Sequence, residues 1–327
     1  MKFLVTGGAG YIGSHMVKYL QDRSFKVDVI DNFSSGNRWA LENCNIFEND
    51  LLDKTALYNI LSQNNYDAVF HFAAKSIAND SFIFEQEYIE NNVIASKNLL
   101  DGIIKYNIKN IIFSSSASIF GLANSSKVDE NHSKNPINPY GKTKLIFEEM
   151  LREYSNNYNL NAAILRYFNA AGADETTRIG EFHSPETHLI PSIFNNLINK
   201  GDVFKIYGND HKTKDGTCVR DYIHVSDLVS AHYLAFKKLI NSKGCFDYNL
   251  GNGNGFSVLE IIRACESVTN RVLRYEFVSK REGEPHYLVA NSTKAISELK
   301  WEIIHHDINE IIKSAWRWHL RLYNEII

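Results

Sequence analysis

The chain has 327 residues, of which 44% are hydrophobic and 22% charged, and its 35 basic and 38 acidic side chains leave a net charge of −3. This composition excludes an intrinsically disordered protein and gives no basic footprint for non-specific nucleic-acid binding. The length predicts about two structural units, and no apolar run is long enough to span a membrane. The apolar start is too short for a secretory signal, so we expect a cytoplasmic protein that binds neither nucleic acid nor membrane.

The first half of the chain alternates short β-branched runs with helical patterns, and Asp53 is placed to cap a helix that runs to about Asn64. The pattern predicts strands at Lys2–Thr6, Lys26–Asp31, Asn45–Glu48, Asp67–His71, Asn110–Ser114 and Asn161–Arg166, with further helices at Tyr11–Asp22, Glu85–Tyr106 and Tyr140–Tyr158. Strands that alternate with helices indicate crossover units. We therefore expect an α/β protein with a Rossmann-type doubly wound parallel sheet.

The pattern loosens after Gly172, and residues 174–187 are polar and rich in turn-forming types. Helices are predicted at Leu189–Lys200, Val225–Leu239, Ser257–Asn270 and Asp307–Leu322, and strands at Lys205–Tyr207, Asp247–Asn249 and Leu273–Phe277. We interpret residues 1–172 as a dinucleotide-binding domain. Residues 173–327 would form a smaller α/β substrate-binding lobe, with segments that pass back to the first domain.

The cysteines and histidines give no sign of a metal site. Cys44, Cys218, Cys245 and Cys265 lie far apart, and none belongs to a Cys-x-x-Cys pair. His183 and His188 are five residues apart, but no cysteine or third histidine stands beside them at ligand spacing. The sequence therefore predicts reduced cysteines and no metal.

Three glycines with the spacing Gly-x-x-Gly-x-x-Gly, at Gly7, Gly10 and Gly13, join the first predicted strand to the first helix. In this context glycines allow the backbone to approach a pyrophosphate, which the amino-terminal end of the helix also attracts. The next strand ends at Asp31, where a carboxylate accepts hydrogen bonds from an adenosine ribose and repels a 2′-phosphate. These features favour NAD over NADP.

Two further strand ends support the same interpretation. Asp50 follows the third strand, where its carboxylate can accept from the adenine amino group. Phe72 and Ala73 follow the fourth strand, where a cofactor would lie across the sheet.

A serine, a tyrosine and a lysine form a candidate catalytic group. Ser116 follows the fifth strand, and Tyr140 and Lys144 lie four residues apart, on one face of the next helix. The free pKa of tyrosine, about 10, is too high for a base at neutral pH, but a nearby ammonium group stabilises the phenolate and lowers it. Together the three side chains can remove a hydroxyl proton while hydride leaves the carbon.

This constellation resembles the extended short-chain dehydrogenase/reductase family, and within it the UDP-glucose 4-epimerases. The similar segments span nearly the whole chain and include Thr6–Ser14, Asn91–Val93, Phe113–Ala117, Pro139–Lys144, Leu165–Asn169, Tyr207–Asp210 and Arg220–Val225. The resemblance implies a tightly held NAD and a reaction that passes through a transient 4-keto sugar. It implies that Tyr140 takes the proton of the sugar 4-hydroxyl, that Ser116 steadies that oxygen and that Lys144 also holds the nicotinamide ribose.

The resemblance also implies the residues of two binding sites. The cofactor residues are Gly7, Gly10, Tyr11, Ile12, Gly13, Asp31, Asn32, Asp50, Leu51, Phe72, Ala73, Asn91, Ser114, Tyr140, Lys144, Tyr167 and Phe168. The UDP-sugar residues are Ser116, Asn169, His188, Leu189, Tyr207, Arg220, Arg281, Glu284 and Leu288. In this second set the arginines suit a diphosphate, Tyr207 can stack near uracil and Glu284 can accept from the uridine ribose.

Leu288 stands where some members of the family carry a bulky tyrosine that limits the sugar pocket, although Tyr287 is adjacent. A smaller side chain would leave room for a 2-acetamido group. We therefore expect activity on UDP-GlcNAc and UDP-GalNAc as well as on UDP-glucose and UDP-galactose.

Several alternatives stay open. Dehydratases of the family place an acidic pair after the catalytic serine or threonine, whereas this chain has Ala117-Ser118, which disfavours elimination. A UDP-glucuronate 4-epimerase or another NAD-dependent nucleotide-sugar enzyme remains possible. A non-catalytic NAD-binding regulator could have lost Tyr140 or Lys144, yet both are present. The resemblance further implies a homodimer that pairs the helices Glu85–Tyr106 and Tyr140–Tyr158.

Overall fold

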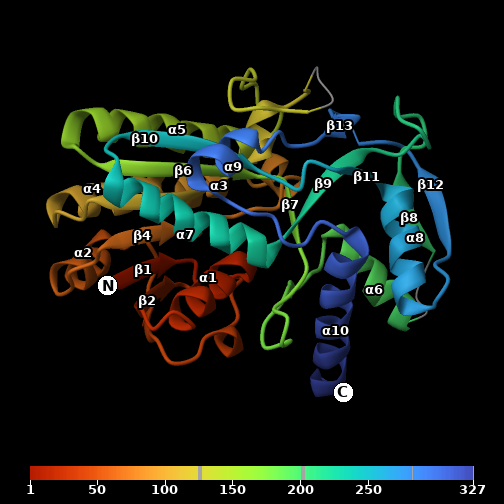
Figure 1. Cartoon of the computed structure of the whole chain (residues 1–327), viewed down its shortest axis with the longest axis horizontal. Helices are drawn as coiled ribbons and strands as arrows, with labels where there is room; N and C mark the ends of the chain where they lie inside the picture. Colours follow the sequence, from red (N-terminus) through yellow and green to blue (C-terminus); the bar gives the residue numbers. More distant parts are fainter. Residues whose placement is uncertain (124–126, 200–202, 282, 327) are drawn as a thin grey trace.

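A seven-stranded parallel sheet forms the larger part of the molecule (Figure 1). The structure is a computed structural model that describes residues 1–123, 127–199, 203–281 and 283–326, so the predicted helix end at Lys200 lies outside the described residues. In the order β10-β6-β5-β4-β1-β2-β3, the strands are Cys245–Leu250, Asn161–Tyr167, Asn110–Ser116, Ala68–His71, Lys2–Thr6, Lys26–Asp31 and Asn45–Glu48. The predicted Rossmann-type α/β fold is confirmed.

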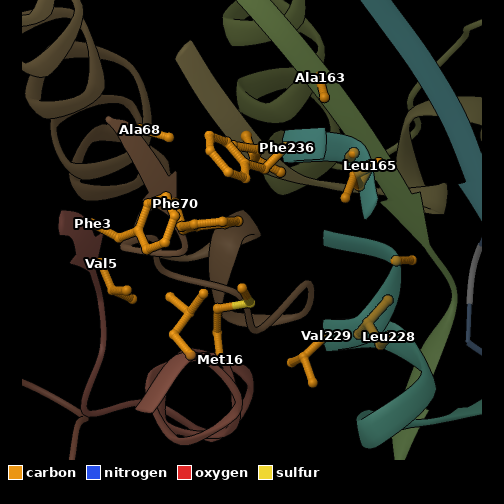
Figure 2. Close-up of a cluster of buried hydrophobic side chains, with 14 of the residues drawn as sticks. Phe3, Val5, Met16, Ala68, Phe70, Ala163, Leu165, Leu228, Val229 and Phe236 are labelled. Atoms are coloured by element: carbon orange, nitrogen blue, oxygen red, sulfur yellow. The ribbon is translucent and has the colours of Figure 1, made fainter. Parts of the chain in front are cut away.

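Helices cover both faces of this sheet. One face packs against α1 (Tyr11–Gln21), α7 (Val225–Asn241) and α9 (Thr293–Leu299), and the other against α2 (Lys54–Ser62), α4 (Ala95–Lys105) and α5 (Pro139–Tyr158). Successive side chains of β1 alternate between these two cores. Phe3 and Val5 join the first core, where the Phe3 ring meets Phe70 and Phe236 edge to face (Figure 2), and Leu4 joins the second.

A smaller lobe lies at the side of the molecule that carries α6 (Leu189–Asn199), α8 (Val258–Thr269) and α10 (Ile308–Ile326), whose apolar faces share a third core (Figure 1). Its strands were only partly predicted. β9 (Val219–His224) pairs with β7 (Asn169–Ala171), β11 (Gly255–Ser257) and β13 (Tyr287–Leu288), and β8 (Phe204–Tyr207) pairs with β12 (Tyr275–Val278). None of β7, β9, β11, β13 and α9 was predicted as an element.

The long helix predicted at Glu85–Tyr106 is a composite. It consists of α3 (Glu85–Ile89), one π-helical segment at Glu90–Ile94 and α4. The prediction of Asp53 as the cap of α2 is confirmed, since its carboxylate accepts hydrogen bonds from the backbone of Thr55 and Ala56. No helix of the described residues is both long enough and apolar enough to cross a membrane.

Candidate active site

The glycine-rich turn between β1 and α1 brings the backbone close to the neighbouring chain. Gly7 has a φ of +70°, and a Cβ there would lie 2.5 Å from the backbone nitrogen of Ala73. At Gly13 a Cβ would collide with the carbonyl oxygen of Gly7. Gly10 begins the helix without a side-chain cap, which leaves the amino-terminal end of α1 available to an anionic group.

A pocket opens beside this turn. Of the expected cofactor residues, it is lined by Gly7, Gly10, Asp31, Asn32, Asp50, Leu51, Phe72, Ala73 and Asn91. Tyr11, Ile12 and Gly13 form the first turn of α1, directly after Gly10. The fold thus gathers most of the expected dinucleotide site from the carboxyl ends of β1, β2 and β4.

Other residues that line this pocket were not among the expected cofactor residues, namely Ile30, Ser34, Ser35, Gly36, Asn49, Ala74, Lys75 and Ala95. Small and polar types in the loop after β2 were the available signal. Gly36 lies so close to the turn that a Cβ would come within 2.7 Å of the Ala9 side chain.

Asp31 is held in a fixed position at the end of β2. One carboxylate oxygen accepts from the backbone nitrogen of Ala9 at 2.9 Å and the other from that of Phe33 at 2.8 Å. Burial raises the pKa of Asp31, and these backbone bonds act against the rise. The side chain of Asn32 donates to the carboxylate of Asp50 at 2.8 Å, which links the ends of β2 and β3.

The π-helical segment presents two successive asparagines to different partners. Asn91 lines the pocket, whereas the buried Asn92 exchanges hydrogen bonds of 2.8 and 2.9 Å with the backbone of Lys75. Asn92 also donates to the hydroxyl of Thr143 at 3.0 Å. This amide therefore ties the loop after β4 to the helix that carries Tyr140.

The expected catalytic residues come together where β5 ends and α5 begins. Asn138 caps α5 by accepting from the backbone nitrogen of Gly141 at 2.7 Å, and Pro139 occupies the first turn. This places Tyr140 in that turn, next to Ser116, the last residue of β5. Burial raises the pKa of Tyr140, and a hydrogen bond with Ser116 acts to lower it.

Lys144 lies one turn further along α5, with its ammonium 5.8 Å from the centre of the Tyr140 ring. The ammonium donates to the carbonyl oxygen of Ser114 at 2.8 Å. Burial lowers the pKa of Lys144 to about 7, against the opposing effect of Glu148. The hydroxyls of Ser114 and Tyr167 are hydrogen-bonded to each other at the ends of β5 and β6.

The next residue on the same face of α5 is Glu148, which is buried. Its carboxylate accepts two hydrogen bonds from Arg166, at 2.8 and 2.7 Å, and one from the hydroxyl of Ser115 at 2.6 Å. Arg166 in turn lies 2.7 Å from Asp247 on β10. This ion-pair network fixes α5 against β5, β6 and β10, directly behind the catalytic side chains.

The expected substrate residues of the smaller lobe form a second group. Arg220 on β9 donates to the carbonyl oxygens of Val219 and Pro285, both at 2.9 Å, and to the Glu284 carboxylate at 3.2 Å. The other Glu284 oxygen lies 3.9 Å from His211, a histidine that sequence reasoning missed. The guanidinium of Arg281 stacks 4.2 Å from the centre of the Tyr207 ring.

Two further substrate residues connect this lobe to the catalytic group. Leu288 pairs with Arg220 in the β13–β9 register, and both Leu288 and Phe168 pack on the cluster that contains Ala117. Ala117 directly follows Ser116. Asn169 is exposed at the start of β7. The leucine thus lies on the side of β13 that faces the catalytic end of the sheet.

His188 and Leu189 are placed elsewhere in the smaller lobe. Leu189 begins α6 and packs on the third core, and His188 contacts Glu181 and His183. This group is close to the glycine-rich turn, because the pKa of Tyr11 is raised first by burial and then by the carboxylates of Glu181 and Glu186.

Comparison with known proteins agrees with this geometry. Residues 3–251 match the model of the NAD dependent epimerase/dehydratase family. A UDP-glucose 4-epimerase of Halalkalibacterium halodurans is 43% identical, over 98% of this chain and 96% of its own length. The structure of a UDP-glucose 4-epimerase from Brucella ovis in complex with NAD superposes with a TM-score of 0.94 at 39% identity, covering 97% of this chain and 98% of that one. A UDP-Glc/GlcNAc 4-epimerase from Campylobacter jejuni superposes with a TM-score of 0.85 at 35% identity, over 98% and 99% of the two chains.

Proposed function

Because the chain belongs to the NAD dependent epimerase/dehydratase family, we propose that it interconverts UDP-glucose and UDP-galactose through a transient 4-keto sugar. The observation that carries the mechanism is the placement of Tyr140 beside Ser116, next to the glycine-rich pocket. A UDP-glucuronate 4-epimerase is the alternative within the same family. It would need a partner for the C6 carboxylate of its substrate.

The pocket fits NAD by shape and by charge. Side chains at Gly7 and Gly13 would fill the space next to the backbone that a pyrophosphate must approach, and the uncapped end of α1 offers free N–H groups to it. Asp31 would hold the adenosine ribose, and Asp50 would accept from adenine. When bound, NAD would supply the group that takes up hydride from C4 of the sugar and gives it back.

Tyr140 moves the proton that accompanies this chemistry. Its phenolate oxygen would accept the proton of the sugar 4-hydroxyl, and the hydroxyl so formed would give the proton back after the sugar has turned over. The nearby ammonium of Lys144 stabilises the phenolate form of Tyr140. Ser116 donates a hydrogen bond to the 4-oxygen of the sugar. The Glu148–Arg166 pair holds α5 in place, so the tyrosine keeps its position while the sugar rotates.

The smaller lobe would anchor the part of the substrate that does not react. Arg220 and Arg281 would bind the diphosphate, Tyr207 would pack near uracil, and Glu284 would accept from the uridine ribose. Asn169 at the mouth of the sheet would donate to a phosphate oxygen. An anchored diphosphate leaves the 4-keto hexose free to present either face.

The leucine at position 288 supports a broader range of sugars. Leu288 and Phe168 pack on the same cluster next to Ser116, so the wall that we assign to the sugar is made of a medium-sized side chain. We extend the proposal to UDP-GlcNAc and UDP-GalNAc on this ground. The similarity to a UDP-Glc/GlcNAc 4-epimerase of Campylobacter jejuni supports the same extension.

The surface of α3, α4 and α5 supports a homodimer, which we propose to work in the cytoplasm. Ile94 is 45% exposed and Ile146 on α5 is 41% exposed, while the loop before α3 exposes Ile83 at 75%. The helices that carry these side chains pack side by side. Pairing them with a second copy would bury the apolar patch. Light scattering should give the mass of a dimer, and Ile94→Asp together with Ile146→Asp should give a monomer.

The test of the function is turnover of UDP-galactose, UDP-GalNAc and UDP-glucuronate by the purified protein without added NAD. Conversion of the first two, lost in Tyr140→Phe and kept in Tyr154→Phe, would support the proposal. Tyr154 is a matched control because it lies on the same helix and its hydroxyl contacts Asp101 outside the site. Conversion of UDP-glucuronate alone would favour the alternative, and conversion of none with NAD supplied would overturn the proposal.

A further inference from the structure

Two glutamates and two histidines converge in the segment between β7 and α6. Glu181, His183, Glu186 and His188 each direct one ligand-type atom to a common point, and these atoms all lie within 4.8 Å of one another. His188 is hydrogen-bonded to Glu181, and Nδ1 of His183 lies 3.7 Å from Glu181 and 3.4 Å from Glu186. The two imidazole rings meet edge to face at 4.9 Å.

The two carboxylates of this cluster are largely shielded, whereas the side chains of His183 and His188 are 27% and 49% exposed and leave it open to solvent on one side. The side chains of Glu181 and Glu186 are 8% and 9% exposed. Two carboxylates so close together and shielded from water repel one another and need a positive partner. The ion pairs that the described residues give them are with His183 and His188, not with a lysine or an arginine.

We propose that Glu181, His183, Glu186 and His188 bind one divalent transition-metal ion, for which Zn²⁺ fits best. A bound ion would replace the protons of the two histidines. Two neutral imidazoles with two carboxylates are a typical donor set for zinc, and their two negative charges balance the ion. Calcium and magnesium prefer sites built of oxygen alone, which disfavours them here. Ligand bonds of about 2.0–2.2 Å in a tetrahedron require donor separations of about 3.3 Å, so the most distant donors would approach by up to about 1.5 Å on binding.

The segment is already held by contacts around these ligands, as metal sites require. The carboxylate of Glu186 accepts from the backbone nitrogens of Thr187 and His188, both at 2.8 Å. The carbonyl oxygen of Glu181 accepts from the indole of Trp318 on α10 at 2.9 Å. Phe182, between two of the ligands, packs against Trp39 from the nucleotide-binding part of the chain.

This arrangement gives the ion a structural role. The ligand segment contacts α10, the start of α6 and the loop that carries Trp39, so a bound ion would fasten the polar connection after β7 to both parts of the molecule. The ion takes no part in the proposed epimerase chemistry, which runs at Tyr140. His188 is also among the expected UDP-sugar residues, so zinc binding is measured without substrate, and the inference can fail while the proposed function holds.

The sequence carries the signal in the pattern Glu-x-His-x-x-Glu-x-His. When only histidines and cysteines are counted, His183 and His188 have no third ligand beside them, and for that reason no metal was predicted. The carboxylates two residues before each histidine complete the donor set. Each Glu-x-His pair supplies one acid and one imidazole, and the loop folds the two pairs together.

The experiment measures metal binding to the full-length protein with its NAD, after treatment with a chelator and dialysis. Co²⁺ is added as a spectroscopic probe, Zn²⁺ is used to displace it, and bound zinc is counted by elemental analysis. We expect one ion per chain, a tetrahedral Co²⁺ spectrum without sulfur ligation, and a rise in melting temperature with Zn²⁺. His183→Ala and Glu186→Gln should each weaken zinc binding at least about 100-fold, and His306→Ala, an exposed histidine outside the cluster, should not.

Three results would overturn the proposal. These are the absence of a bound ion in the wild-type protein, a Co²⁺ spectrum with cysteine ligation, or zinc affinity unchanged in both variants. Circular dichroism checks that each variant is folded. Glu186→Gln keeps the size of the side chain. If His183→Ala does not fold, the zinc affinity of Glu186→Gln therefore tests the proposal.

Discussion

Glu148 and Arg166 form a two-bonded ion pair in the interior, and both side chains are almost inaccessible to solvent, at 1% and 0%. Glu148 lies one helical turn after Lys144, which lies one turn after Tyr140, so the pair supports the catalytic face of α5 from behind. The same guanidinium contacts Asp247 on β10. The catalytic helix is thereby fastened to three adjacent strands.

Removal of one member of this pair should destabilise the protein strongly. Arg166→Met leaves the Glu148 carboxylate buried without its main partner, and we expect a loss of about 3–5 kcal/mol in the free energy of unfolding. Urea unfolding with NAD present in excess measures it. The double variant Glu148→Leu with Arg166→Met should be more stable than Arg166→Met alone, because no buried charge is then left over. A double variant as unstable as the single one would contradict this account.

Loss of the Lys144 ammonium should slow turnover and move its pH dependence. Without that positive charge the phenolate of Tyr140 is less stable and its pKa is higher. In Lys144→Met the acidic limb of the pH–rate profile should therefore shift to higher pH, and kcat near neutrality should fall at least about 100-fold. Steady-state rates between about pH 6 and 10 measure both. An unshifted acidic limb would mean that Lys144 only holds the cofactor.

Asp31 should decide the choice between NAD and NADP. Its carboxylate is positioned by the backbone of Ala9 and Phe33, and loss of its charge-assisted bonds to a ribose should cost about 1.5–3 kcal/mol. Asp31→Asn should therefore bind NAD about 10- to 150-fold more weakly and should discriminate less against NADP. Fluorescence titration of the cofactor-free protein measures both affinities, with Asp22→Asn as a surface control. If Asp31→Asn weakened the binding of NAD and of NADP equally, other residues would determine the preference for NAD.

Leu288 should set the size of the accepted sugar. Leu288→Tyr would fill the space next to Phe168 and the Ser116 end of β5. We expect turnover of UDP-GalNAc to fall at least about 10-fold, while turnover of UDP-galactose changes little. Leu288→Met, which keeps the volume, should leave both rates unchanged. If Tyr287→Leu alters the ratio and Leu288→Tyr does not, the specificity belongs to the neighbouring side chain.

Buried neutral histidines should make the protein sensitive to acid. Burial lowers the pKa of His232 to about 4, with the backbone bond to Leu228 opposing, so between about pH 6.5 and 4 the unfolded chain binds a proton that the folded chain does not. The stability that neutral His232 contributes is present above pH 6.5 and is lost as the pH falls. His232→Leu should reduce the slope of unfolding free energy with pH by up to about 1.4 kcal/mol per unit. Urea titrations at pH 7.5 and 5.5 compare the slopes, and an unchanged slope would exclude this contribution.

The sequence predicted the Rossmann sheet well because its strands are apolar runs between clear helical patterns. It failed on β9, whose central residue Asp221 is fully buried. Three backbone N–H groups, those of Asn252, Gly253 and Ala290, satisfy this carboxylate, and burial still raises its pKa to about 6. A buried acid paired with distant backbone is invisible to a hydrophobic pattern, because its partners become neighbours only in the folded chain.

In the candidate site, too, some residues could be predicted from the sequence and others could not. Gly7, Asp31 and Tyr140 were predicted because local motifs determine their positions. The loop Ser34–Gly36 was missed because only the folding of that loop brings it to the pocket. Asn91 reaches the pocket from a π-helical segment, and a regular helical pattern does not predict that irregularity.

The edge position of β10 has a consequence for synthesis of the chain. β10 pairs with β6 along its whole length, yet it is made long after the other strands of that sheet have left the ribosome. Until Cys245–Leu250 has been synthesised, β6 is an edge strand with unpaired backbone groups, and Arg166 lacks its ion pair with Asp247. The family match likewise extends to residue 251, one residue beyond this strand. A fragment that ends at residue 172 should therefore aggregate when expressed alone, whereas the nascent chain can close its sheet only after three quarters of its length has been translated.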